Sequence, residues 1–376
     1  MNDEKGPLLL WLNGGPGYSS LYGTFNENGP YVVKENLTLE LRNTSWNREF
    51  SVLYIDNPVG AGFSFTENEK GYARNLEDSS RDLFEGLKQF FMLFPYYSTL
   101  YLTGESYACK YLVGLAHKIL NQQPKMVVPL TGAIIGNGMC DPRHQMLYGQ
   151  SLHSAGLISG KKKELFEKSE QQIRDLIDAR QYLKAYHLWD WLMLGELTNG
   201  AGSVFGNATG YSYRYNQLHD RAPEELKYYE RFVVLNSTRA ALHVGNRPFS
   251  GNSFLVEQHL FADFMVSAAP LIDELLTARI DLLLYSGALD IIVPTISTEN
   301  MISRLKWSGH RKFSNARRRV YREGKGNQTA ITGYIQQAEH LTLAVVINSG
   351  HILPYEQPSV ALDLVAKFVN SEPFTN

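Results

Sequence analysis

Gly104-Glu-Ser-Tyr-Ala108 is the segment of this sequence whose residue types could carry out covalent chemistry. An apolar run at residues 99–102 precedes it, and an amphipathic run over residues 111–119 follows it. A serine in a sharp turn between a strand and a helix is typical of a nucleophile elbow, because the turn exposes the hydroxyl and the helix directs N–H groups toward a developing anion. The pattern therefore predicts Ser106 as a nucleophile. A tight turn without chemistry is the alternative.

A nucleophilic serine needs a histidine base and an orienting carboxylate, and in an open α/β sheet both must lie beyond the carboxyl ends of strands. Of the ten histidines, His351 lies just after the apolar strand predicted at residues 341–347. By the same rule Asp290 follows the strand predicted at residues 280–285. The order Ser106, Asp290, His351 is that of α/β-hydrolases, so these residues are predicted to form a catalytic triad. A surface histidine and a capping aspartate are the alternatives.

An oxyanion hole is predicted from two backbone N–H groups. One belongs to Tyr107, the residue after the serine. The other is expected from the glycine loop Trp11-Leu-Asn-Gly-Gly-Pro-Gly17, which directly follows the first predicted strand. Gly15 is the expected donor, because a residue without Cβ lets a substrate approach the backbone closely. The alternative is a plain Gly-Pro turn.

The elements that must position these residues can be read from hydrophobic runs. Near-continuous apolar runs, rather than alternating ones, predict strands that are covered on both faces. Such runs lie at residues 7–12, 50–55, 100–102, 132–135, 280–285 and 341–347. Helical periodicity appears between several of them, as at residues 76–94, and again at residues 360–368 after the last strand. This alternation predicts an α/β fold with a mostly parallel sheet.

The strand rhythm stops between residues 151 and 270. A charged helical pattern occupies residues 161–177, and a segment rich in Gly, Tyr and Asn at residues 198–215 is predicted to be a loop. We therefore expect an α/β core of residues 1–150 and 271–376 with an inserted, mostly helical cap at residues 151–270.

The composition is ordinary for a globular protein of 376 residues, with 44% hydrophobic and 20% charged residues and a net charge of −2. This balance gives no reason to expect nucleic acid or an acidic membrane as a partner, and no apolar stretch approaches the length of a membrane span. The basic run at residues 310–325 is interpreted as a solvated surface, because no aromatic ladder accompanies it. No metal or cofactor is predicted.

Two signals about the cellular compartment conflict. Cys109 and Cys140 cannot form a disulfide framework and on that count favour a reducing compartment, while the sequence leaves open whether they meet. Asn-x-Ser/Thr sequons favour a secretory route instead. These candidate glycosylation sites are Asn36, Asn43, Asn207, Asn236 and Asn327. Residues 1–6 show no signal-peptide character.

The motifs together resemble those of the serine carboxypeptidases, in the right order and over almost the whole chain. The matching segments are Trp11-Leu-Asn-Gly-Gly-Pro-Gly, Trp46-Asn, Asp56-Asn-Pro-Val-Gly-Ala-Gly-Phe-Ser, Gly104-Glu-Ser-Tyr-Ala, Gly136-Asn-Gly, Leu289-Asp-Ile-Ile-Val-Pro and Gly350-His-Ile-Leu-Pro-Tyr-Glu-Gln-Pro. His243-Val-Gly-Asn and Gly333-Tyr-Ile-Gln-Gln most resemble the vitellogenic-carboxypeptidase-like branch. The resemblance implies an α/β-hydrolase fold and removal of C-terminal residues at acidic pH through an acyl-enzyme.

The resemblance also implies that Asn13, Gly14, Glu27 and Glu105 bind the terminal carboxylate of the substrate. Two glutamates held close together share a proton, since both cannot ionise cheaply. A protonated carboxyl can then donate a hydrogen bond to the substrate, whereas two ionised ones would repel it. Without the resemblance, Glu105 would be interpreted as a solvent-facing turn residue and Glu27 as a helix-end charge.

Further implications of the resemblance are peptide or protein C-termini as partners, a homodimer, and a secreted or lysosomal/vacuolar location. The chain departs from the family in lacking its upstream strands, so that an exposed edge is expected at the first strand. Cys109 also replaces the usual glycine, and its side chain is expected to crowd the elbow. These departures motivate an inactive binding or stabilising relative as one alternative function. The other is acyl transfer to an alcohol by the same triad.

Overall fold

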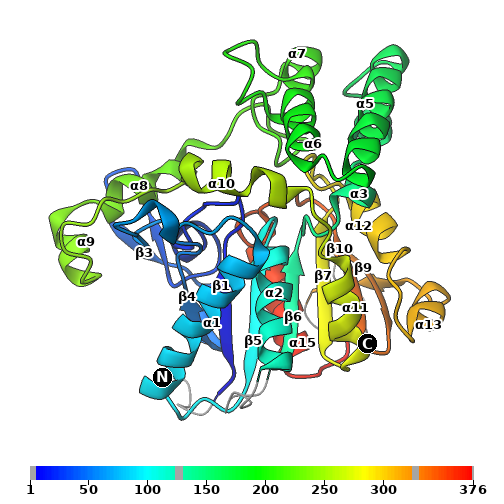
Figure 1. The fold of residues 1–376 in the computed structure, drawn as a ribbon. Helices are drawn as coiled ribbons and strands as arrows, with labels where there is room; N and C mark the ends of the chain where they lie inside the picture. Colours follow the sequence, from blue (N-terminus) through cyan, green and yellow to red (C-terminus); the bar gives the residue numbers. More distant parts are fainter. Residues whose placement is uncertain (1–5, 123–129, 324–329, 375–376) are drawn as a thin grey trace.

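The apolar runs form the neighbouring strands from β4 to β10 of one sheet, whose order is β4-β1-β5-β6-β7-β10-β9-β8 (Figure 1). This computed structural model describes residues 6–122, 130–323 and 330–374. All neighbours from β4 to β10 are parallel, whereas β9 is antiparallel to β10 and β8. The strands are β1 (Leu8–Leu12), β4 (Ser51–Tyr54), β5 (Leu100–Glu105), β6 (Leu130–Gly136), β7 (Asp281–Gly287), β8 (Arg319–Tyr321), β9 (Gly333–Ala338) and β10 (Leu341–Val346), with a separate hairpin of β2 (Tyr31–Val33) and β3 (Leu39–Leu41). The predicted α/β fold with a mostly parallel sheet is confirmed.

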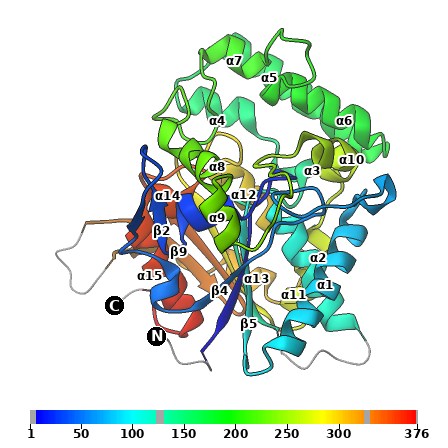
Figure 2. The same ribbon diagram turned by 90° about the vertical axis from the view of Figure 1, so that its left-hand side faces the viewer.

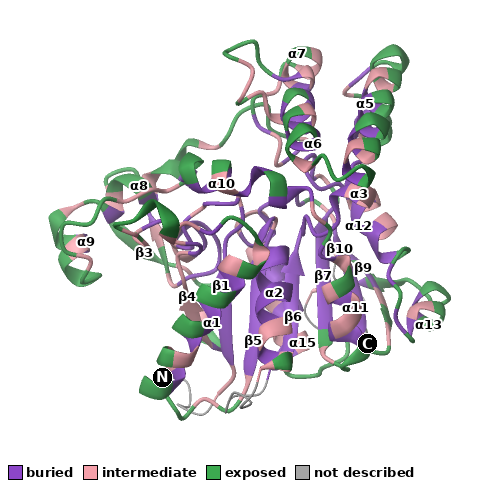
Figure 3. Ribbon diagram, in the orientation of Figure 1, coloured by how far each residue is buried: buried purple, intermediate pink, exposed green. Residues whose placement is uncertain are grey.

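Helices cover both faces of the sheet, which explains why its inner parallel strands are apolar along most of their length (Figures 2 and 3). Alternate residues of β1 enter two different cores: Leu10 packs with α1, α2 and α11, while Leu9 packs with α15. The helices are α1 (Leu76–Leu93), α2 (Ala108–Asn121), α3 (Pro142–Gln145), α4 (Tyr148–Ser154), α5 (Gly160–Asp178), α6 (Tyr182–Trp189), α7 (Val204–Thr209), α8 (Tyr228–Val233), α9 (Asn236–Ala241), α10 (Phe254–Phe264), α11 (Ala269–Thr277), α12 (Thr295–Ile302), α13 (His310–Ser314), α14 (Leu353–Glu356) and α15 (Pro358–Val369). Short π-helical turns lie at Gly23–Glu27 and Asp190–Leu194, and 3₁₀ turns at Trp46–Arg48, Glu69–Gly71 and Glu224–Lys227.

The first strand is not an edge. β1 pairs with β4 on one side and with β5 on the other, so Leu10 lies opposite both Leu53 and Leu102. The expectation of an exposed edge at the first strand was wrong, because β4 returns to cover it. β4 is the edge strand on this side of the sheet.

Between β6 and β7 the chain is helices and loops, of which α5, α6 and α7 lie beyond the carboxyl ends of the strands, at the top of Figure 1, whereas α11 packs beside α2 against the sheet. The predicted loop at residues 198–215 contains α7, so that prediction was wrong in part. α4 crosses the predicted boundary at residue 150, and α11 crosses the one at residue 270. The division into core and cap stays a prediction.

Cys109 and Cys140 form a disulfide between the first turn of α2 and the loop after β6. Both residues are fully buried. The side chain of Cys109 therefore points toward the loop that follows β6, where its sulfur is bonded to Cys140, and Cys109 carries no free thiol beside the elbow. A disulfide also removes the argument for a reducing compartment.

The remaining surface expectations concern charge, membranes and glycosylation. Within the described part of the basic run, Arg317, Arg318 and Arg319 are exposed, and Arg318 pairs with Glu299. Among the described residues, no helix is both long enough and apolar enough to span a membrane. The sequon at Asn327, the end of the basic run, and residues 1–5 of the segment assessed for signal-peptide character lie outside the described residues.

Candidate active site

Ser106 lies in a strained turn between β5 and α2. Its φ is 61°, in the left-handed region that side chains other than glycine rarely adopt. Backbone hydrogen bonds hold this conformation: Ser106 N–H donates to the carbonyl of Gly136 (2.9 Å), and Met139 N–H donates to the carbonyl of Ser106 (3.1 Å). The serine is half-buried at the carboxyl edge of the sheet, which is the context of a nucleophile elbow.

His351 and Asp290 form a buried pair in which His351 Nδ1 and Asp290 Oδ2 are 2.7 Å apart. The other oxygen of Asp290 accepts hydrogen bonds from the N–H groups of Ile292 (2.9 Å) and Val293 (3.1 Å), which stabilise the ionised carboxylate. Since Nδ1 is engaged, Nε2 is the nitrogen that can act as a base. Ser106 and His351 line the same cavity of about 310 Å³.

The loop that carries His351 is held by two residues that the sequence analysis did not assign to the site. Asn137, directly after β6, donates from Nδ2 to the carbonyl of His351 (2.6 Å), and its Oδ1 accepts from Gly287 N–H at the end of β7 (2.8 Å). The ring of Tyr215 stacks on the imidazole with 4.8 Å between centroids. The segment Gly136-Asn-Gly at the end of a predicted strand could have indicated Asn137 as a site residue. No feature of the sequence indicated that Tyr215 contacts His351.

The glycine loop after β1 approaches the elbow closely. A Cβ on Gly14 would lie 2.6 Å from Tyr107 N and 2.9 Å from Ser106 Cβ, so only glycine fits there. Gly15 has a φ of 112°, which also requires glycine. Gly14 and Gly15 line the cavity beside Ser106. The structure thus brings the two predicted oxyanion segments together around the serine.

Glu27 and Glu105 are both buried beside Ser106, although their elements are far apart in sequence. Glu27 ends the π-helical turn after the glycine loop, and Glu105 ends β5. Asn13 orients Glu27: its Nδ2 donates to Glu27 Oε1 (2.8 Å), while its Oδ1 accepts from Trp11 Nε1 and Gly23 N–H (both 2.9 Å). All three predicted carboxylate-binding side chains therefore meet in one polar cluster.

The carboxyls of Glu27 and Glu105 act directly on each other, and ionisation of both at such short range is unfavourable. Burial raises the pKa of Glu27 to about 7. Burial, and then the neighbouring charge of Glu27, raise the pKa of Glu105 well above its ordinary value. The pair is therefore protonated at acidic pH and can donate a hydrogen bond to an anion.

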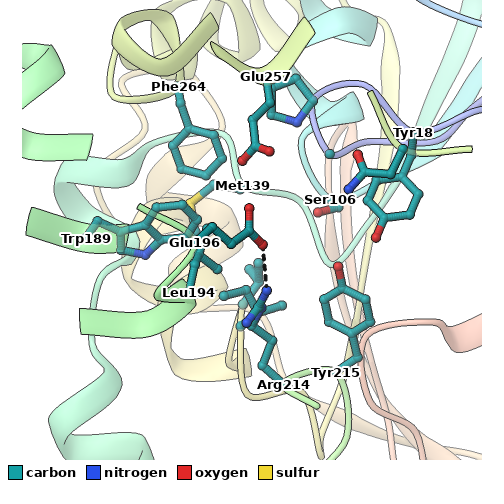
Figure 4. Close-up of a pocket in the computed structure, with 15 residues that line it drawn as sticks. Tyr18, Ser106, Met139, Trp189, Leu194, Glu196, Arg214, Tyr215, Glu257 and Phe264 are labelled. Atoms are coloured by element: carbon teal, nitrogen blue, oxygen red, sulfur yellow. Dashed lines mark hydrogen bonds and ion pairs between the residues drawn. The ribbon is translucent and has the colours of Figure 1, made fainter. Parts of the chain in front are cut away.

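A second cavity also borders Ser106 and contains about 600 Å³ of empty space, its open mouth included (Figure 4). The sequence analysis did not predict it. Its walls come mainly from the helical segment: Met139, Trp189, Leu194, Glu196, Arg214, Glu257 and Phe264. These residues are separated by long stretches of sequence and follow no motif, so only the general abundance of aromatic residues hinted at an apolar pocket.

Comparisons with known proteins identify the class. The family model of the serine carboxypeptidases matches residues 1–371. A venom serine carboxypeptidase of Apis mellifera is 43% identical and covers 100% of this chain and 80% of its own length. The probable serine carboxypeptidase CPVL of Homo sapiens is 40% identical, over 97% of this chain and 77% of its own. The chain therefore belongs to the serine carboxypeptidase family and is a serine-type carboxypeptidase, a hydrolase.

Two further comparisons support the predicted branch of the family and the predicted fold. The vitellogenic carboxypeptidase of Aedes aegypti is 34% identical over 98% of this chain and 78% of its own, so the predicted branch is confirmed. The crystal structure of Kex1Δp, a prohormone-processing carboxypeptidase from Saccharomyces cerevisiae, aligns with a TM-score of 0.83 at 24% identity, covering 98% of this chain and 83% of that one. This match confirms the α/β-hydrolase fold.

Proposed function

We propose that this carboxypeptidase releases C-terminal residues from peptides at acidic pH, with Ser106, Asp290 and His351 as its triad. The observation that carries the proposal is the proton-sharing pair of Glu27 and Glu105 next to the serine, because an endopeptidase has no use for a buried reader of a free carboxylate. Both Glu105 and His351 line the cavity that contains Ser106.

In the proposed first step, Ser106 Oγ attacks the last peptide carbonyl carbon while its proton passes to Nε2 of His351. Asp290 stabilises the resulting imidazolium through Nδ1. The oxyanion accepts hydrogen bonds from the N–H groups of Gly15 and Tyr107. The C–N bond then breaks, and His351 returns its proton to the leaving amino group.

Water completes the cycle. It attacks the acyl-enzyme carbonyl, gives a proton to His351 and forms the new C–O bond. The bond to the serine breaks, and Ser106 Oγ regains the proton. Acyl transfer would differ only in using an alcohol instead of water, so an added alcohol acceptor and identification of the product distinguish the two reactions.

The carboxylate reader gives the reaction its pH dependence. At acidic pH, Asn13, Gly14 and the protonated glutamate pair bind the terminal carboxylate of the substrate. As the pH rises through the raised pKa values of Glu27 and Glu105, both ionise and repel it. Binding is therefore strongest at acidic pH.

Hydrolysis of N-blocked dipeptides at acidic pH tests the proposal, with the corresponding C-terminal amides as matched controls. We expect the free acids to be cleaved faster than the amides, and Ser106→Ala to lose roughly 10⁴-fold or more in kcat. Equal rates of peptide hydrolysis by the native enzyme and by Ser106→Ala would refute the proposal. Failure of a fluorophosphonate to label Ser106 in folded protein would support the inactive binding relative instead.

We also propose a secretory route, to a secreted or lysosomal/vacuolar location, and glycosylation of the sequons. The sequon asparagines that the structure describes are all exposed: Asn36, Asn43, Asn207 and Asn236. The disulfide supports the same compartment, and one relative is named a venom enzyme. A mass decrease after endoglycosidase treatment would test the glycosylation. The homodimer stays a prediction for sedimentation analysis.

A further inference from the structure

We infer that the 600 Å³ cavity binds the penultimate side chain of the substrate, and that Glu257 makes it select a cationic head on a long apolar stem, as in lysine or arginine. The inference rests on the proposed function and adds the substrate class to it. Glu257 is proposed here as the specificity-determining residue.

The position of the cavity relative to Ser106 assigns it to the acyl side. Asn13, Gly14 and Glu105 line the first cavity, where the terminal carboxylate of the leaving residue is expected. The second cavity shares Gly15, Tyr18, Ser106 and Tyr215 with the first, but its remaining walls come from residues that do not line the first. A peptide with its last carbonyl at Ser106 therefore directs its penultimate side chain into the second cavity.

The walls of this cavity suit an apolar stem. Trp189 and Phe264 stack on each other with 4.5 Å between ring centroids and form one wall together with Leu194 and Met139 (Figure 4). Alkyl chains of three or four carbons gain free energy from such surfaces. A short polar side chain would leave them uncovered.

The charges of the cavity do not balance. Glu257 and Glu196 both direct their carboxylates into it (Figure 4). Glu196 is paired with Arg214 (3.1 Å), whereas the hydrogen-bond partner of Glu257 is the neutral hydroxyl of Tyr186. With all groups ionised, the cavity carries one excess negative charge, and a cation from the substrate would neutralise it.

The carboxylate of Glu257 is held in place relative to the nucleophile. Glu257 and Phe264 lie two helical turns apart on α10 and face the same cavity. The same helix carries Asp263, whose Oδ2 accepts from Tyr107 Oη (2.8 Å) and from Lys110 Nζ (2.9 Å) on the elbow helix α2. α10 is therefore fixed to the element that positions Ser106, so a cationic head at Glu257 has a defined distance from the reacting carbonyl.

The preference should depend on pH. Burial raises the pKa of Glu257 to about 7. The groups that act on it are Tyr186, which donates a hydrogen bond, the nearby carboxylates Glu196 and Asp190, and the cation Arg214. The anionic form of Glu257 thus becomes more populated as the pH rises toward 7, and the preference for a cation should increase in the same direction.

The test compares two N-blocked dipeptides that share a C-terminal leucine and differ in a penultimate lysine or norleucine, which has the same apolar stem without the ammonium. In the native enzyme we expect kcat/KM to be about tenfold higher for lysine near neutral pH, with a smaller ratio at about pH 5. Glu257→Gln should remove the preference and its pH dependence, leaving the norleucine peptide within about twofold.

Glu170→Gln is the matched control. Glu170 is also buried with a pKa raised to about 7 by burial, but it accepts from Gly149 N–H away from the cavity. This variant should keep the lysine preference of the native enzyme.

Three results would overturn the inference. One is a native enzyme that cleaves the norleucine peptide with a kcat/KM equal to or higher than that for the lysine peptide. Another is an equal loss on both peptides in Glu257→Gln, which would indicate a contact to the peptide backbone. If neither peptide is cleaved and Ser106 is not labelled by a fluorophosphonate, the proposed function fails as well.

Discussion

The two sides of Ser106 are built in different ways. The leaving-group side consists of residues at the ends of strands and in the loops directly after them: Asn13 after β1, Glu27 in the following turn and Glu105 at the end of β5. The acyl side consists mainly of side chains from α6 to α10 and the loops between them, such as Trp189 and Glu257, with smaller contributions from the loops after β1, β6 and β7.

This difference separates chemistry from selectivity. Groups that bind a carboxylate or an oxyanion must lie within a few tenths of an ångström of fixed positions, and the strand ends supply such positions through short local segments. A cavity for a side chain only needs volume and a balance of charge, which many combinations of helical residues provide. The chemical side therefore leaves motifs in a sequence, and the selective side does not.

Asp290→Asn should have the largest effect, because it acts on the centre that both sides share. The asparagine favours the wrong tautomer of His351, so we expect kcat to fall roughly 10⁴-fold. The fall should be the same for every substrate, whatever its last two side chains. Steady-state kinetics on a panel that varies each position separately would measure this.

The control for this variant is Asp281→Asn, at the opposite end of the same strand. Asp281 opens β7 and pairs with His340 Nδ1 (2.8 Å) on the exposed amino edge of the sheet. It should leave kcat within about twofold. A loss in Asp290→Asn that depended on the side chains of the substrate would show that Asp290 also shapes one of the cavities.

A buried ion pair between Lys110 on α2 and Asp263 on α10 connects the two sides of the site. Asp263→Asn leaves a buried ammonium without its counter-charge, and we expect a loss of about 3 kcal/mol in the free energy of unfolding. Adding Lys110→Met should restore most of it. Denaturant unfolding of the single and double variants measures both values.

The exposed pair of Lys88 and Glu85 provides the comparison for this cycle, and Glu85→Gln should change the free energy of unfolding by less than about 1 kcal/mol. If Asp263→Asn were equally mild, the pair would not be the structural joint between α10 and the elbow.

The sequence was most informative where local geometry forces a residue type. The strand–turn–helix pattern around Ser106 predicted the elbow, and the rule that ligands bind beyond the carboxyl ends of strands selected His351 over His340. The structure brings these residues together as expected. The roles of Glu27 and Glu105 came only from the family resemblance, because neither the turn nor the helix end indicates burial by itself.

Features that depend on chain tracing in three dimensions could not be predicted. Cys109 and Cys140 are 31 residues apart, and nothing local shows that the loop after β6 returns to α2. The position of β1 inside the sheet depends on β4 pairing outside it. Glu257 and Trp189 meet only because α6 packs on α10.

The smallest expected effect concerns pH, and it distinguishes the two sides most clearly. Each side contains buried carboxyls with raised pKa values, but a rise in pH changes substrate binding in opposite directions on the two sides. In the proposed function, the protonated form of Glu27 and Glu105 binds substrate on the leaving-group side, so its contribution is complete at low pH and is lost as the pH rises. In the inference for the acyl side, the ionised form of Glu257 selects substrate, so its contribution grows with pH.

Glu105→Gln tests this contrast. The amide donates a hydrogen bond at every pH and adds no charge, so the rise of KM for free-acid peptides between about pH 5 and about pH 8 should shrink from about tenfold to a few-fold. It should not vanish, because Glu27 still ionises. Glu257→Gln, measured with the norleucine peptide, should keep the native rise. Parallel pH profiles for Glu105→Gln and the native enzyme would instead assign the acidic preference to a group other than Glu105.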